Sequence, residues 1–122
     1  MPTRSRLLVI LLLVLPPLAA AEWSIDPTEN NPVCTQLDIQ DQPTAIADGE
    51  GGVFVSWRDY RDGTSKIYAQ RLDAEGEPLW AADGVRVCTY NSEQRYHRMV
   101  SDMAGGVIIV WQDETSTADI YA

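Results

Sequence analysis

The chain has 122 residues and a formal net charge of −9, with 18 acidic residues against 9 Lys and Arg. A phosphate backbone is bound by clustered Lys and Arg, and here acidic residues outnumber basic ones. We therefore expect no nucleic-acid partner and interpret the acidic groups as a solvated surface.

Residues 1–21 have the pattern of a secretory signal peptide. Arg4 and Arg6 precede an uncharged apolar run that ends at Leu15, and three alanines then supply an Ala-x-Ala cleavage pattern ending at Ala21. The run is well short of the roughly 20 apolar residues that span a bilayer. We predict cleavage after Ala21, no membrane span afterwards, and a secreted or cell-surface protein. Cleavage removes two arginines and no acid, which changes the net charge from −9 to −11.

An internal repeat occupies the remaining chain. Aligning the sequence with itself at a spacing of 54 residues gives nine identities in 26 ungapped positions. A one-residue deletion after these positions indicates a loop, beyond which Ile67-Tyr68-Ala69 falls on Ile120-Tyr121-Ala122. The identical pairs are Cys34/Cys88, Thr35/Thr89, Gln40/Gln94, Asp48/Asp102, the Gly-Gly-Val runs that begin at Gly51 and Gly105, Trp57/Trp111 and Asp59/Asp113.

Each copy predicts four short strands, which the first copy presents in full. Residues 43–51 indicate a short strand and a Gly-rich turn. Residues 51–57, and likewise 105–111 in the second copy, place apolar side chains on both faces of a strand, which predicts burial on both sides. A tight hairpin with positive-φ residues at Asp62-Gly63 leads to a strand over 66–73. Residues 75–89 then predict a turn and a last strand.

Four antiparallel strands that recur at this spacing, without helical periodicity, are typical of a β-propeller blade. We expect an all-β fold made of antiparallel four-stranded blades of an incomplete β-propeller, about one and a half to two blades in extent. The predicted boundaries are 22–35 for the last strand of a preceding or closing blade, 36–89 for the first blade and 90–122 for a truncated second blade. A β-sandwich with chance internal similarity is the alternative.

The repeat also resembles a known family, the propeller-type repeat of exported and mostly uncharacterised bacterial surface proteins. The resemblance covers residues 23–122 and implies blades that act as binding or structural modules. The second copy departs from it at Met103-Ala104 and at Thr115, where turn residues are lost while buried positions are kept. The residues that carry the resemblance are Asp48-Gly49, Gly51-Gly52, Val55, Trp57, Asp59, Arg61, Gly63, Ile67-Tyr68, Gln70-Arg71-Leu72-Asp73, Gly76, Trp80 and Gly84-Val85.

The repeats are too few for a closed ring. A ring of 4 to 8 blades at this repeat length needs roughly 220 to 430 residues, and the chain without its signal peptide has 101. We therefore expect either the N-terminal fragment of a longer protein or an assembly of several chains. The expected partners are the remaining blades in the same chain, further copies, or an unknown protein or glycan ligand.

The candidate site residues favour structural roles. Cys34 and Cys88 occupy equivalent places in successive repeats, which are commonly further apart than a disulfide allows, so buried free thiols are favoured over a bridge. Trp57 and Trp111 fit core packing better than sugar stacking. His97 has no second ligand at metal spacing. The aspartates at 59, 62, 113 and 119 lack a calcium-loop pattern and suit turns.

We therefore predict no catalytic, cofactor-binding or metal-binding residue, and a non-enzymatic binding or scaffold module at the cell surface. A ligand site is expected in the Asp-rich loops at one end of the ring. The alternatives are the N-terminal part of a secreted glycan hydrolase, which would need a carboxylate pair across a cleft, and a spacer without activity.

Overall fold

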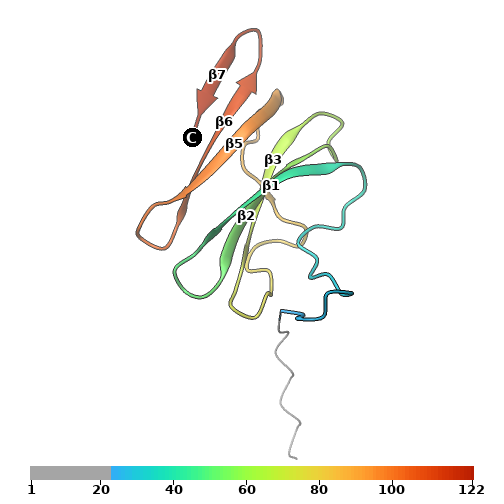
Figure 1. Ribbon diagram of the computed structural model, residues 1–122. Coiled ribbons are helices and arrows are strands. Elements are labelled where there is room, and N and C mark those ends of the chain that lie inside the picture. The colour runs from blue at the N-terminus through green and yellow to red at the C-terminus, as the bar shows by residue number, and fades with distance from the viewer. Residues whose placement is uncertain (1–22) are drawn as a thin grey trace, which may run out of the picture.

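The computed structural model describes residues 23–122, which form two antiparallel sheets and no helix (Figure 1). The predicted signal peptide and its cleavage site lie outside these residues. The first sheet has the order β1 (Gln40–Ala47), β2 (Val53–Asp59), β3 (Lys66–Leu72), β4 (Val85–Arg86). The second has the order β5 (Glu93–Ser101), β6 (Val107–Glu114), β7 (Ala118–Tyr121). The all-β prediction is confirmed, and residues 23–122 hold no helix that could cross a membrane.

Both sheets are meanders, in which neighbours in the sequence are also neighbours in the sheet. The four strands expected of the first copy are all present, and β2 pairs with β3 in unbroken register from Val53↔Leu72 to Asp59↔Lys66. Residues 23–39 form no strand. They nevertheless pack on the first sheet's connections, since Trp23 lies against Gly76.

The repeat extends to backbone irregularities. The β1–β2 register shifts between Asp41 and Thr44, and the β5–β6 register shifts between Arg95 and Arg98. Inside these bulges Gln42 has φ 52° and Tyr96 has φ 55°, a left-handed conformation that is uncommon outside glycine. The two residues are 54 positions apart, so each sheet bends at the same point.

The turn between the first two strands of each sheet is also the same. The Asp48 carboxylate accepts hydrogen bonds from the amides of Glu50 and Gly52, each at 2.8 Å. Asp102 accepts from Ala104 at 2.7 Å and from Gly106 at 2.8 Å. The turn survives the loss of glycine because Met103 adopts φ 63° where Gly49 has φ 84°.

The β2–β3 connection differs from the tight hairpin predicted at Asp62-Gly63. Gly63 has φ 82°, but Asp62 has no positive φ, and the strands are joined by the six-residue loop 60–65. Asp62 instead accepts a hydrogen bond from the Tyr68 hydroxyl at 2.8 Å. The extra loop length brings polar side chains to this end of the sheet.

The second sheet packs through β5 against β1, β2 and β3. We call the side of the first sheet that carries Phe54, Ser56 and Ile67 the contact face; these side chains are 3%, 0% and 0% exposed. Gln94 fixes the junction between the two sheets. Its backbone N–H donates to the Ser65 carbonyl at 2.9 Å, and its side-chain oxygen accepts from the backbone N–H of Ile67 at 3.1 Å.

The equivalent side of the second sheet is uncovered. It carries Val100, Ile108, Val110 and Ile120, with exposures of 58%, 45%, 37% and 71%, and we call it the open face. The expectation that 105–111 is buried on both sides is therefore wrong for this strand. The contact face is covered by β5 of the second sheet. No corresponding strand among residues 23–122 packs on the open face.

Candidate functional site

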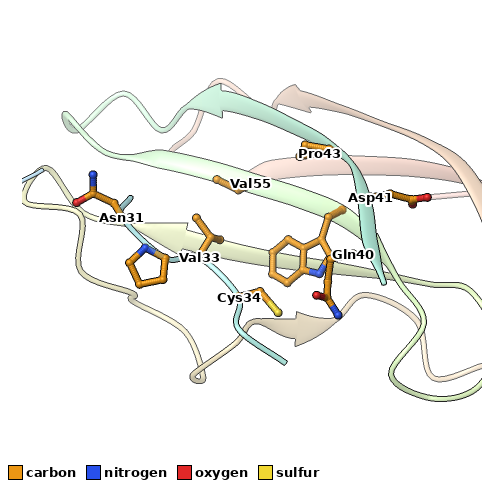
Figure 2. A pocket seen from close by; sticks show the side chains of 9 residues that line it. Asn31, Val33, Cys34, Gln40, Asp41, Pro43 and Val55 are labelled. Atoms are coloured by element: carbon orange, nitrogen blue, oxygen red, sulfur yellow. The ribbon is translucent and has the colours of Figure 1, made fainter. Parts of the chain in front are cut away.

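An apolar pocket lies on the side of the first sheet opposite the contact face. Its volume is about 340 Å³, and the segment 31–34 forms one wall while β1 and β2 form the other (Figure 2). Figure 2 shows Val33 and Cys34 on the same side of the sheet as Val55. The lining residues are Asn31, Pro32, Val33, Cys34, Gln40, Asp41, Pro43, Val55 and Trp57.

Next to this pocket lies a polar cluster that we call the arginine site, made of Cys34, Asp59, Arg61 and Tyr68. The Arg61 guanidinium donates to the Asp59 carboxylate at 2.6 Å and to the Cys34 sulfur at 3.0 Å. It also donates to the carbonyl of Asp83 at 2.9 Å and lies 4.1 Å from the centre of the Tyr68 ring. One cation is thus held by a carboxylate, a thiol, a carbonyl and an aromatic face.

Asp59 is fully buried at the end of β2 and is satisfied on both oxygens. Trp57 donates its indole N–H to one oxygen at 2.8 Å, and the Arg61 amide donates to the other at 2.9 Å. Burial by itself would raise the pKa of Asp59, but the hydrogen bonds from Arg61 and Trp57 outweigh it and hold that pKa below its usual value. Asp59 in turn raises the pKa of Arg61, and burial raises the pKa of the Cys34 thiol.

A second group of polar contacts ties the N-terminal segment to the same end of the sheet. The Asp83 carboxylate accepts from the Thr35 amide at 2.8 Å and from the Gln36 side chain at 2.8 Å. These bonds lower the pKa of Asp83, with the Thr35 amide as the largest cause. The segment that covers the pocket is therefore held in place by the loop before β4.

The cysteines and tryptophans for which the sequence favours structural roles are free thiols and core residues in the structure. Cys34 and Cys88 are free thiols, half-buried rather than fully buried. Trp57 and Trp111 are 3% and 7% exposed and belong to the core. They stack on Tyr68 and Tyr121 with ring centres 6.3 and 6.2 Å apart, which repeats the same pair in each sheet.

His97 is buried between the sheets at 1% exposure. The Ser56 backbone lies beside its ring but makes no well-formed hydrogen bond with either ring nitrogen. Burial lowers the pKa of His97, and the Ser56 backbone opposes this shift only in part. Across residues 23–122, His, Cys, Asp and Glu form no group of three that could hold a metal ion.

Comparisons with protein families, with curated proteins and with solved structures found no match to this chain. The contacts of the molecule itself therefore have to indicate its function. Sequence reasoning overlooked Arg61 as the centre of a site, although its replacement by Thr115 in the second copy was a visible signal.

Proposed function

We propose that this chain is part of an exported β-propeller-type repeat protein and acts as a binding or scaffold module at the cell surface. The observation that carries the proposal is the open face of the second sheet. Its residues are the repeat equivalents of those on the contact face, so the contact that joins the two sheets can be made again by a further repeat.

Three features favour two stacked copies of one repeat rather than two unrelated sheets. The bulge, the Asp-based turn and the Trp–Tyr stack recur at equivalent positions. Two meanders that share such details and pack in series are typical of neighbouring blades. An apolar surface of this kind marks an interaction site rather than solvent-facing structure.

The test is self-association of the full chain, expressed with its own N-terminal segment and purified after export. Sedimentation velocity over micromolar to sub-millimolar concentrations should show concentration-dependent assembly. The variant I108K, which places a charge on the open face, should weaken assembly by about tenfold or more, since burial of an unpaired charge is unfavourable. I25K is the matched control, because Ile25 is 99% exposed and lies far from the open face in the sequence.

A chain that stays monomeric throughout this range, or that assembles equally well as I108K, would remove the support for a repeat contact. The non-enzymatic part is tested separately with a panel of soluble glycans. We expect no bond cleavage, and hydrolysis that a single carboxylate-to-amide change abolishes would favour a glycan hydrolase instead.

A further inference from the structure

The second sheet contains a cavity where the first sheet holds the guanidinium of Arg61. We call it the C-terminal cavity; its volume is about 220 Å³, far more than the roughly 30 Å³ that one water occupies. It is lined by Cys88, Tyr90, Asp113 and Tyr121, of which the first, third and fourth are the repeat equivalents of Cys34, Asp59 and Tyr68.

The cavity lacks its cation because Thr115 stands where the first copy has Arg61. The side chain of threonine is too short to reach the carboxyl group in the way that arginine does. One carboxyl oxygen of Asp113 and the indole nitrogen of Trp111 have no hydrogen-bond partner, although Asp113 is only 2% exposed. In the first sheet the matching Asp59 carboxylate accepts hydrogen bonds both from the Trp57 indole N–H and from Arg61.

No other cation of residues 23–122 fills the gap. The charge of Asp113 acts on Lys66 of the first sheet, but the Lys66 ammonium group donates its hydrogen bond to the carbonyl of Ser92. Within residues 23–122 no ion pair to Asp113 is formed. A buried carboxyl group without a partner is unfavourable, and a bound cation would relieve this.

We propose that the C-terminal cavity binds a guanidinium group supplied from outside the repeat. The first sheet shows the required contacts in place, because its arginine meets a carboxylate, a thiol and a tyrosine ring. The second sheet offers the same three groups. A planar guanidinium suits them better than a compact ammonium ion, since it can donate to the carboxylate while its face lies on the ring. This site does not depend on the proposed repeat assembly.

The test uses the full exported chain, labelled with ¹⁵N, and follows the indole N–H signal of Trp111, assigned with the variant W111F. The probes are methylguanidinium, free arginine amide and the blocked peptide acetyl-Gly-Gly-Arg-Gly-Gly-amide. We expect saturable shifts of this signal, and D113N should weaken them by about tenfold or more. T115R should supply the guanidinium internally, abolish the response to all probes and raise the melting temperature by about 4 °C or more. T117R adds the same charge to the same loop, and because Thr117 does not line the cavity it should leave probe binding unchanged.

The two sources of the guanidinium are separated by the probes. Tighter binding of the peptide than of arginine amide indicates an arginine of a partner polypeptide, and equal binding indicates a small molecule. The proposal is overturned if the wild-type chain shows no saturable shift, even where T115R is stabilised, because the cavity then accepts the group only from within the chain. It is also overturned if probe binding persists in T115R.

Discussion

The contact face of the first sheet and the open face of the second have matching residues in opposite surroundings. Phe54 and Ile67 are 3% and 0% exposed, while their equivalents Ile108 and Ile120 are 45% and 71% exposed. The difference arises only because β5 covers one face and nothing within residues 23–122 covers the other. An apolar pattern in a repeat therefore specifies contact with a neighbour, and it leads to burial only where the neighbour is present.

The largest expected difference between the faces concerns their isoleucines. I67A should lower the free energy of unfolding by about 2–5 kcal/mol, because it leaves a cavity in a fully buried site. I120A should change it by less than about 0.5 kcal/mol, as is usual for an exposed position. Urea unfolding of the two variants, at a protein concentration below that at which the chain assembles, measures both values. Equal losses would mean that the open face is covered in solution.

Arg61 and its repeat equivalent Thr115 offer the next comparison. R61A should destabilise the chain by about 2–3 kcal/mol, because it leaves the buried Asp59 carboxylate without its cation; the value is below that of a fully buried pair since Arg61 is partly exposed. T115A should have almost no effect, because Thr115 is exposed and its hydroxyl donates only to the exposed carbonyl of Thr117. Thermal unfolding of both variants is the measurement, and a neutral R61A would contradict the structural role of the cluster.

The junction between the sheets predicts a pH dependence. Because the pKa of His97 is lowered in the folded state, the unfolded chain takes up its proton first, near its ordinary pKa of about 6.5. Stability from this group is complete above that pH and is lost as the pH falls, with a limiting slope of about 1.4 kcal/mol per pH unit. Arg58, Arg98 and Asp41 are the charged groups that act on the ring.

Urea unfolding from about pH 7 to about pH 5 should therefore show a slope that H97Q reduces, while carboxylates titrate mostly below this window. If H97Q retained the full slope of the parent chain, another group would be responsible. The comparison isolates the contact between the sheets, because His97 comes from the second sheet and lies against the first.

The smallest expected effect is at the matching turns. M103G should stabilise the chain by about 0.5–1 kcal/mol, since glycine adopts the observed left-handed backbone without the strain that a side chain adds. The opposite change in the first sheet, G49A, should destabilise it by about 1 kcal/mol. Chemical unfolding resolves the sign of both changes. A destabilised M103G would show that the exposed Met103 side chain contributes contacts of its own.

The strands could be predicted from the sequence because their signals are local. Both β2 and β6 begin with an apolar run directly after a Gly-Gly pair, and this local signal gives the position of each strand. The turn that Asp48 and Asp102 stabilise could be predicted for the first copy only. In the second copy, Met103-Ala104 in place of Gly49-Glu50 suggested that the turn is lost, whereas the hydrogen bonds accepted by Asp102 preserve it.

The candidate site could not be predicted because it depends on groups that are distant in the sequence. Cys34, Arg61 and Asp83 meet only after the N-terminal segment has been laid along the first sheet. The exposure of Ile108 was equally hidden, because periodicity reports which residues share a face and not whether that face is covered. Propensity thus determines the elements, while packing determines their surroundings.

The hydrogen bonds of Gln94 give the repeat a direction. This side chain completes the edge of the preceding sheet, so the second sheet needs the start of β3 to be in place before its own junction can form. The side chain of Gln40, the first-copy equivalent, instead donates to the carbonyl of Leu37 three residues before it. The first sheet can therefore form its hydrogen bonds without the second, whereas the junction of the second sheet uses the first as its template, so repeats of this kind would add in order from the N-terminus.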